Sequence, residues 1–350
     1  MTFPTTTRAW TYSGPFPRGF KLSTISVPQP AEDASAQDSL IVRVTAAALN
    51  PVDIQLMNLP RGLFERGKSE ERGIGFDFAG VVLTAPKDSG HQVGDEIMGT
   101  TFSPLAIHRG TLAEVAVLDA KATVAVAKPQ GWTHAQAAAI PLVWLTAKTS
   151  IESVSSYLTM SKPKVVVLGG SSATGIYSIM LAKRQGWTIL STSSAKNKDF
   201  LISLGVDEHV DYTKDDVRQQ VTKFRPDAII DCVGGTECIG IAGNKRYITI
   251  VGDKTSRDTM GGPYVYYDLR HPVNAVSQWI RWVKGHVGLG ESYDIVHLEY
   301  QKDWLQDAPE VLATKDIFID SVHPFERADE AYKRLDTGRA KGKVVVEIGA

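Results

Sequence analysis

The sequence predicts an α/β protein in which a parallel-sheet domain is inserted between two pieces of a β domain. Short β-type runs separated by Gly, Pro and Asp dominate residues 1–130, a texture typical of antiparallel sheets. From residue 131, buried apolar strands alternate with helices, which is the pattern of a parallel sheet covered on both faces. After about residue 285 the β texture returns. We therefore expect one domain from 1–130 plus 285–350 and a second from 131–284.

The predicted β domain contains runs rich in β-branched residues, bounded by turn-forming residues. Its first piece holds strands near 40–45, 79–84 and 112–117. Its second piece holds strands near 317–323 and 343–348, separated by a helix near 328–335.

The predicted parallel-sheet domain begins with a helix at 134–139, for which Thr133 is a suitable N-cap. A continuous apolar strand at 164–168 leads into a helix at 173–185, where apolar side chains recur at helical spacing and Gly186 ends the helix. The remaining expected elements are a strand at 188–192, a helix at 197–204 closed by Gly205, and short strands at 208–211, 227–231 and 246–251.

Composition narrows the class of protein. Of 350 residues, 43% are hydrophobic and 22% charged, and the net charge is −1. This balance removes the electrostatic attraction on which binding to nucleic acid or an anionic membrane relies. Two cysteines cannot build a disulfide framework or a four-cysteine zinc site. No apolar run approaches the ~20 residues of a membrane span, and the N-terminus lacks an apolar signal core. We expect a reduced, soluble, cytoplasmic protein.

The strongest local signal is a turn of small residues between the strand at 164–168 and the following helix. Small side chains let a pyrophosphate approach the N–H groups of a helix N-terminus, where the helix dipole favours an anion. The turn also has P-loop spacing, but Ile176 stands where a P-loop has Lys, which argues against a nucleotide triphosphatase. A plain strand–turn–helix junction is the alternative to a dinucleotide site. The turn residues are Gly169, Gly170, Ser171, Ser172, Ala173, Thr174 and Gly175.

The end of the next strand indicates which dinucleotide binds. NAD enzymes place an acid there to hold the ribose 2′-OH. Here residues 191–198 are rich in Ser and Lys, and the first acid is Asp199. Ser193 and Lys196 suit a 2′-phosphate, so we expect NADPH; a solvated Ser/Lys turn is the alternative.

Further motifs carry a resemblance that spans essentially the full length. The chain resembles the medium-chain dehydrogenase/reductase superfamily, and within it the zinc-free quinone oxidoreductase and enoyl reductase branch. The turn at 169–174 is also similar to that of fungal trans-acting enoyl reductases of polyketide pathways. The resemblance implies a GroES-like β domain with an inserted Rossmann-type domain. The matching pieces, in family order, lie at 48–53, 75–80, 93–99, 110–114, 137–147, 169–175, 204–207, 211–212 and 338–345.

The resemblance implies chemistry without zinc. Zinc alcohol dehydrogenases of this superfamily carry Cys where Asn50 stands and Gly-His-Glu where Gly75-Phe76-Asp77 stand. Without a Lewis acid, hydride addition to a conjugated C=C or a quinone is easier than reduction of an isolated carbonyl. The implied activity is NADPH-dependent reduction of an enone, enoyl thioester or quinone. The alternatives are a trans-acting enoyl reductase serving a polyketide synthase, or a non-enzymatic NADPH-binding scaffold.

The resemblance also assigns site residues. Asn50, Asp53 and Thr146 are expected around the nicotinamide, although Asp53 could equally be a structural hydrogen-bond acceptor. Tyr212 is expected to join Ser193 and Lys196 at the 2′-phosphate. The remaining residues expected beside the cofactor are Cys232, Val233, Val251, Gly252 and Lys343. Cys232 is expected there as a small packed residue rather than a redox thiol. Lys343 is expected to reach the phosphates, with a solvated lysine as the equal alternative.

The proton donor is not identified by the motifs. Gln55 stands where several quinone reductases carry Tyr, so the tyrosines of 262–267 or solvent are the candidates. No tyrosine has Lys four residues later, which excludes the short-chain reductases. The family suggests a homodimer, formed through an edge strand near 247–251.

Overall fold

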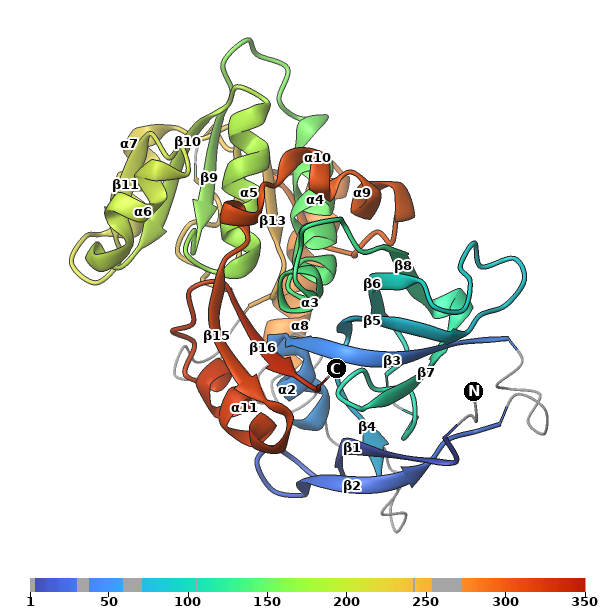
Figure 1. The fold of residues 1–350 in the computed structure, drawn as a ribbon. Coiled ribbons are helices and arrows are strands. Elements are labelled where there is room, and N and C mark those ends of the chain that lie inside the picture. Colours follow the sequence, from blue (N-terminus) through green and yellow to red (C-terminus); the bar gives the residue numbers. More distant parts are fainter. Residues whose placement is uncertain are drawn as a thin grey trace. The chain divides into compact units, whose positions relative to one another are not determined.

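The computed structural model describes residues 4–29, 38–58, 71–104, 106–241, 243–253 and 272–349. The chain forms two compact units (Figure 1). Of the described residues, the first unit comprises those up to 142 and from 300 onward, and the second comprises those at 143–253 and 272–299. The main divisions therefore fall at 142/143 and 299/300, whereas the sequence placed them at 130/131 and 284/285. No helix in the described part of the chain is long and apolar enough to span a membrane.

The first unit is built on a seven-stranded sheet with strands from both ends of the chain. Its order is β15-β16-β3-β5-β6-β8, and β7 also pairs with β3. The C-terminal β16 pairs antiparallel with β3, which confirms that one β domain is assembled from two pieces. The strands are β3 (Ser39–Leu49), β5 (Asp77–Thr84), β6 (Glu96–Thr101), β7 (Val115–Asp119), β8 (Thr123–Ala127), β15 (Ile319–Pro324) and β16 (Lys343–Glu347).

A smaller sheet and several helices complete this unit. The three-stranded sheet has the order β2-β1-β4, formed by β1 (Thr6–Tyr12), β2 (Phe20–Ser26) and β4 (Arg72–Gly73). Thr133 caps α3 in a capping box, and α3 packs on β3 and β5, so residues 134–138 belong to this unit. The helices are α2 (Pro51–Asn58), α3 (His134–Ala138), α9 (Lys302–Gln306), α10 (Ala308–Val311) and α11 (Ala328–Asp336).

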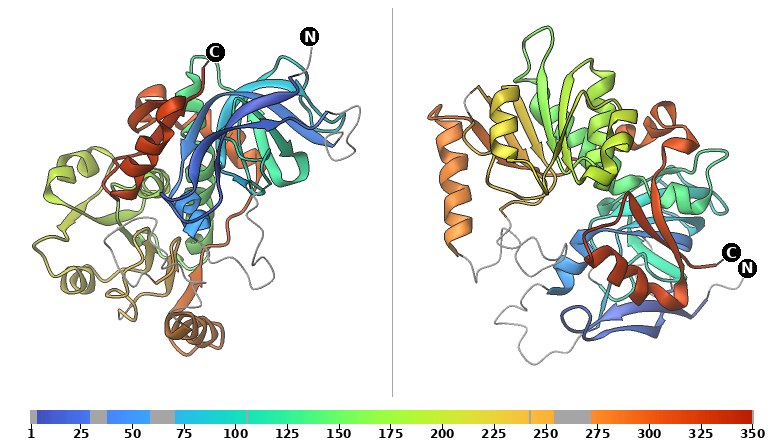
Figure 2. Two further views of the ribbon diagram at one scale, coloured as in Figure 1. Left: turned by 90° about the horizontal axis from the view of Figure 1, so that it is seen from below. Right: turned by 90° about the vertical axis from the view of Figure 1, so that its left-hand side faces the viewer.

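The second unit contains the predicted parallel sheet. Six strands follow the order β11-β10-β9-β12-β13-β14, and every pair is parallel. Helices lie on both faces (Figure 2). The strands are β9 (Lys164–Leu168), β10 (Thr188–Ser193), β11 (Glu208–Asp211), β12 (Ala228–Asp231), β13 (Arg246–Thr249) and β14 (Ser292–Ile295). The helices are α4 (Pro141–Ser155), α5 (Ala173–Arg184), α6 (Lys198–Ser203), α7 (Val217–Phe224) and α8 (Pro272–His286), with a 3-10 turn η3 at Ala195–Asn197.

The edge strand of this sheet was wrongly predicted. Residues 246–249 form β13, which lies between β12 and β14, so 247–251 is not an edge. On this side of the described sheet the edge strand is β14, which the sequence analysis missed, and β11 forms the other edge. With four residues, two of them polar, β14 carries too weak an apolar pattern to be recognised alone.

Candidate active site

The glycine-rich turn lies where the order of the parallel sheet reverses. From β9 the chain adds β10 on one side, and β12 lies on the other. Ligands of open α/β sheets bind beyond the carboxyl ends of the strands at such a switch point. The turn follows β9 directly and leads into α5, so the sequence prediction places the dinucleotide at this switch point.

Two contacts fix the shape of the turn. Ser172 is the N-cap of α5, and its Oγ accepts a hydrogen bond from the Gly175 N–H at 3.1 Å. Gly169 has φ 78°, in the left-handed region, and a Cβ there would lie 2.3 Å from Val233 Cγ1. Only glycine therefore lets the turn close against the segment after β12.

Gly170 and Gly175 have no room for a side chain. A Cβ on Gly170 would lie 2.1 Å from Ser191 Oγ, and one on Gly175 would lie 2.4 Å from the Gly169 carbonyl oxygen. The turn is thus held tightly against β10 and α5. The first N–H groups of α5 have no partner within the helix, and the dipole of this 12-residue helix adds positive potential there. This arrangement fits a pyrophosphate.

The ends of β12 and β13 form two further turns at the same edge of the sheet. Asp231 Oδ1 accepts from the Val233 and Gly234 N–H groups, both at 2.8 Å. Thr249 Oγ1 accepts from the Gly252 N–H at 3.0 Å. Burial raises the pKa of the Cys232 thiol, so Cys232 is a packed, unreactive group.

At the end of β10 the structure differs from the prediction. Ser193 is 1% exposed, and its Oγ donates to the Ser194 carbonyl at 3.0 Å. The same oxygen lies 2.8 Å from His209 Nε2. Ser193 was predicted to bind a 2′-phosphate, but both hydrogen bonds turn its hydroxyl inward. Lys196 and Tyr212 are exposed, as a phosphate site requires.

A buried polar cluster lies in the first unit, at the ends of β3, β5 and β16. Lys343 Nζ lies 2.9 Å from Asp77 Oδ2 and 2.5 Å from Asn50 Oδ1. Asn50 Nδ2 donates to Asp77 Oδ2 at 3.0 Å. All three residues are at most 2% exposed. Lys343 was predicted to reach the cofactor phosphates; instead it forms a buried ion pair, because an unpaired ammonium at this depth would be strongly unfavourable.

Asp53 lies in α2 beside this cluster. Its Oδ2 accepts from the Asn50 N–H at 2.7 Å, which fits the structural role left open for it. Burial raises the pKa of Asp53 to about 7, and Lys343 counteracts part of this shift. Burial and the neighbouring Asp53 also raise the pKa of Tyr332 on α11.

The other predicted residues are dispersed. Thr146 is half-buried in α4 of the second unit, where its carbonyl accepts from Ser150 Oγ at 2.8 Å. Gln55 is half-buried in α2. The tyrosines of 262–267 lie outside the described residues.

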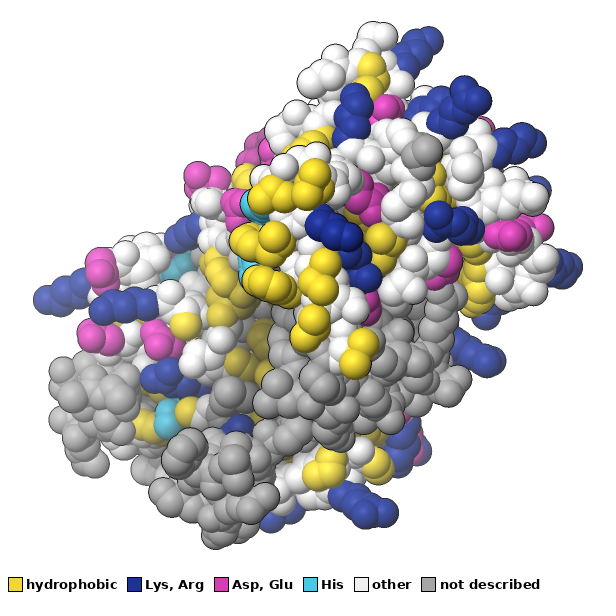
Figure 3. All heavy atoms as spheres, turned by 180° about the vertical axis from the view of Figure 1, so that it is seen from behind, with side chains coloured by type: hydrophobic (Ala, Val, Ile, Leu, Met, Phe, Trp, Pro, Cys, Tyr) yellow, Lys and Arg dark blue, Asp and Glu magenta, His cyan; other side chains and the backbone are white. Residues whose placement is uncertain are grey.

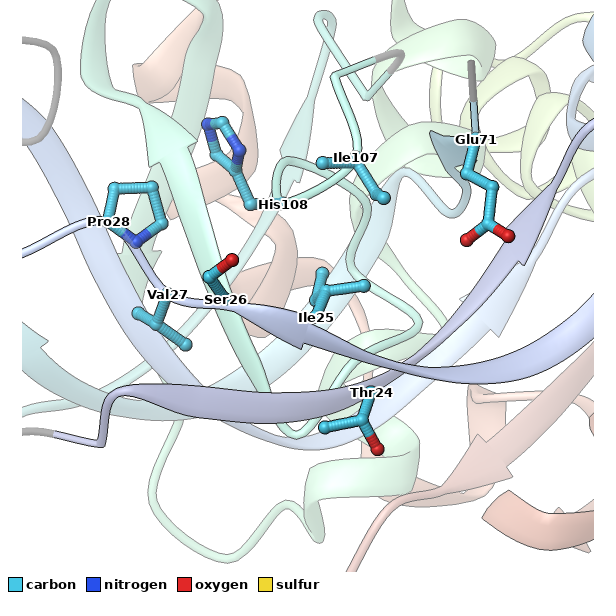
Figure 4. Close-up of a pocket in the computed structure, with 8 residues that line it drawn as sticks. All are labelled: Thr24, Ile25, Ser26, Val27, Pro28, Glu71, Ile107 and His108. Atoms are coloured by element: carbon cyan, nitrogen blue, oxygen red, sulfur yellow. The ribbon is translucent and has the colours of Figure 1, made fainter. Parts of the chain in front are cut away.

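A surface pocket on the first unit is separate from these groups (Figure 4). β2 and the residues after it form much of its wall, and none of the predicted site residues lines it. We do not assign it to the candidate active site. Its lining residues are Thr24, Ile25, Ser26, Val27, Pro28, Glu71, Ile107 and His108.

Comparisons with known proteins agree with this architecture. The family model described as an alcohol dehydrogenase GroES-like domain matches residues 36–129, and that described as a zinc-binding dehydrogenase matches 204–346. Among solved structures, a quinone oxidoreductase from Coxiella burnetii has a TM-score of 0.75 at 22% identity, covering 98% of this chain and 99% of its own. A mycobacterial protein complexed with NADPH has a TM-score of 0.69 at 19% identity, covering 98% and 100%.

Curated relatives have reductase names. A trans-enoyl reductase of Aspergillus terreus is 30% identical, over 99% of this chain and 98% of its own. A mitochondrial NAD(P)H oxidoreductase of Mus musculus is 28% identical over 89% and 82%. A 2-methylene-furan-3-one reductase of Solanum lycopersicum is 27% identical over 99% and 80%. Fold and near full-length similarity together show that this chain belongs to the medium-chain dehydrogenase/reductase superfamily of oxidoreductases, in its quinone oxidoreductase and enoyl reductase branch.

Proposed function

We propose that this protein is an NADPH-dependent reductase of a conjugated C=C, in an enone or enoyl thioester, or of a quinone, and that it works without zinc. The observation that carries the proposal is the glycine-rich turn at the switch point of the parallel sheet, which leads directly into α5. The reductase names of the relatives support the substrate class.

The residues of the second unit fit a dinucleotide. The turn at 169–175 and the N-terminus of α5 would hold the pyrophosphate. Exposed Lys196 and Tyr212 would hold the 2′-phosphate, and residues 191–198 contain no acidic side chain of the kind that holds a ribose 2′-OH in NAD enzymes. The NADPH bound in the mycobacterial neighbour is consistent with this preference. When bound, NADPH supplies the hydride.

The buried polar cluster around Asp77 does not fit a zinc ion, although one matching family model is described as zinc-binding. Asn50, Phe76 and Asp77 offer neither a thiolate nor an imidazole. Asp77 Oδ1 accepts from the Leu142 N–H at 2.9 Å, and Asp77 Oδ2 pairs with Lys343. An ammonium group thus already neutralises the carboxylate that a metal would require.

The same contacts restrict the role of Asn50. Its carbonyl oxygen accepts from Lys343, and its amide donates to Asp77 and to the Ala48 carbonyl at 3.3 Å. Both amide N–H groups of Asn50 are therefore used, and it has no donor left for a substrate oxygen unless one of these bonds opens. That residues 50, 53 and 146 contact the nicotinamide stays a prediction. We propose solvent as the proton donor to the enolate.

A trans-acting role beside a polyketide synthase is the second candidate. The 30% identity to a trans-enoyl reductase favours it. In that case the substrate would be an enoyl chain bound to a carrier protein, and free small enones would be poor substrates.

Titration and turnover test these proposals together. Binding of NADPH and NADH to the purified protein is followed by intrinsic fluorescence, and NADPH oxidation is then measured with a quinone, an enone and an enoyl thioester. Tight NADPH binding with turnover supports the reductase. Binding without turnover favours a carrier-bound substrate or the scaffold alternative. Absence of binding by either nucleotide contradicts the proposal.

We also propose a cytoplasmic homodimer that uses the β14 edge. The helix α8 packs on β14 and carries exposed apolar side chains, and hydrophobic side chains gather on the face in Figure 3 where α8 lies. Val276, Trp279 and Ile280 are 54%, 64% and 42% exposed. An open strand edge beside an apolar helix is complementary to a second copy about a twofold axis. Light scattering should give a dimer that Ile280→Glu dissociates; a monomeric wild type contradicts it.

A further inference from the structure

A histidine lies directly behind the proposed 2′-phosphate site. His209 is on β11, and its register partner on β10 is Ser191, so the parallel pairing directs His209 to the same face of the sheet as Ser191 and Ser193. Its Nε2 lies 2.8 Å from Ser193 Oγ. His209 is half-buried, and its ring contacts the end of β10 at Ser193.

The direction of the hydrogen bonds follows from Ser193. Its one hydroxyl proton has two acceptors in reach, the Ser194 carbonyl at 3.0 Å and His209 Nε2 at 2.8 Å. We assign the proton to the Ser194 carbonyl, and in this arrangement the Ser193 oxygen accepts from a proton on His209 Nε2. Burial and the nearby Lys198 lower the pKa of His209, while Asp211 and Asp215 oppose that shift.

This relay ends on the turn that carries Lys196. The Ser194 carbonyl also accepts from the Asn197 N–H at 2.9 Å, and Ser194 is the N-cap of η3 (Ala195–Asn197). His209, Ser193 and Ser194 thus form a continuous chain of hydrogen bonds from β11 to η3. Lys196 lies in the middle of η3 and is exposed.

We propose that His209 is a positioning residue for NADPH, which holds η3 through Ser193 so that Lys196 and the Ser194 hydroxyl face the 2′-phosphate. This inference rests on the proposed function. NADH lacks the 2′-phosphate and makes no use of Lys196, so loss of the relay should weaken NADPH selectively. His209 acts through Ser193 and does not itself contact the nucleotide.

The variants isolate the Nε2 donor. His209→Leu removes it while keeping an apolar side chain of moderate size, and His209→Gln restores an N–H donor. A matched control exists in the first unit, where His323 Nε2 lies 3.0 Å from Ser321 Oγ. His323→Leu removes a similar His–Ser pair far from the dinucleotide residues in sequence.

The experiment measures Kd for NADPH and NADH by fluorescence titration in the full-length protein, with far-UV circular dichroism to verify folding. We expect His209→Leu to raise the Kd for NADPH about tenfold and the Kd for NADH less than twofold. His209→Gln should recover most of the NADPH affinity, and His323→Leu should change neither Kd.

The outcomes separate the two proposals. If wild type binds NADPH no better than NADH, the proposed cofactor preference is wrong and this inference is wrong with it. If wild type prefers NADPH but His209→Leu leaves the ratio of the two Kd values unchanged, only the role of His209 is wrong. An equal loss for both nucleotides, or a His209→Gln protein no better than His209→Leu, also overturns it.

Discussion

Burial is the main reason why the Asp53 carboxyl is pH-sensitive. Its pKa is raised from 3.8 to about 7, chiefly by burial. Between these values the folded protein keeps a proton that the unfolded chain has lost, so the stability falls as the pH rises through this window. Asp53→Asn does not titrate, and its side-chain oxygen can still accept from the Asn50 N–H.

We therefore expect Asp53→Asn to gain stability relative to wild type as the pH rises from 4.5 to 8, by on the order of 2–4 kcal/mol in total. Denaturant unfolding at several pH values measures this. Asp199→Asn makes the same chemical change at an exposed aspartate and is the matched control. A pH-independent difference for Asp53→Asn would contradict the assignment.

Gly175 makes a second prediction at the residue scale. Alanine in place of glycine usually stabilises a helix by about 1 kcal/mol, but here a Cβ would lie 2.4 Å from the backbone oxygen of Gly169. We expect Gly175→Ala to lose about 1–3 kcal/mol of stability and at least tenfold in NADPH affinity. Gly14→Ala is the control, because the nearest atom to its Cβ is at 3.4 Å. Unchanged NADPH binding in Gly175→Ala would contradict the pyrophosphate site.

Residue types were easier to predict than residue roles. Small residues between β9 and α5 are recognisable because their positions are local. The buried partners of Lys343 and Ser193 were not predicted because they are not local. Lys343 pairs with Asp77, 266 positions away, and His209 lies 16 positions from Ser193. Only the fold brings such atoms together.

At the element scale, the cap of α5 has two roles that can be separated. Ser172 Oγ accepts from the Gly175 N–H, and Asp216 Oδ1 accepts from the Gln219 N–H at 2.9 Å as the N-cap of α7. Loss of either cap should lower the free energy of unfolding by about 1 kcal/mol. Only Ser172→Ala should also weaken NADPH, by several-fold, because only α5 faces the proposed pyrophosphate. Chemical denaturation and NADPH titration of both variants check this; equal affinities would remove Ser172 from the site.

Element prediction succeeded where the pattern was strong. β9, β10 and α5 were found near their observed bounds because each is continuous or periodic. The helices α7 and α8 were missed, and so was β14. In α8 the pattern is reversed: buried Gln278 packs inward while Trp279 and Ile280 are exposed, so its apolar face does not mark the core.

At the scale of the whole molecule, the inserted second unit separates the two pieces of the β domain in sequence. The C-terminal piece is attached to the N-terminal piece by the pairing of β16 with β3 and by the contacts of Lys343 with Asp77 and Asn50. The change from β-type runs to alternating strands and helices, and back again, predicted this insertion correctly. It could not predict that a buried ion pair joins the two pieces, since this depends on the register of β16.

Two lysine variants test whether this ion pair is structural or part of the nucleotide site. Lys343→Met leaves Asp77 as a buried charge without its ammonium partner, which should cost about 3–5 kcal/mol. The Lys343→Met/Asp77→Asn double variant should recover much of that loss, because no buried charge is left unpaired. Lys196→Glu should leave stability nearly unchanged, since Lys196 is exposed, but weaken NADPH far more than NADH.

Thermal unfolding and titration of both nucleotides should give opposite signatures for the two lysines. Lys343→Met lowers the unfolding temperature and, while folded, keeps the wild-type ratio of NADPH to NADH affinity. Lys196→Glu keeps the wild-type unfolding temperature and lowers the ratio of NADPH to NADH affinity. If Lys343→Met keeps its stability but binds NADPH more weakly while its affinity for NADH is unchanged, Lys343 contacts the cofactor phosphates, as the sequence suggested. In that case the Lys343 ammonium would have no structural function and would have to turn toward the cofactor. The two variants therefore decide between a lysine that holds the β domain together and one that binds the nucleotide.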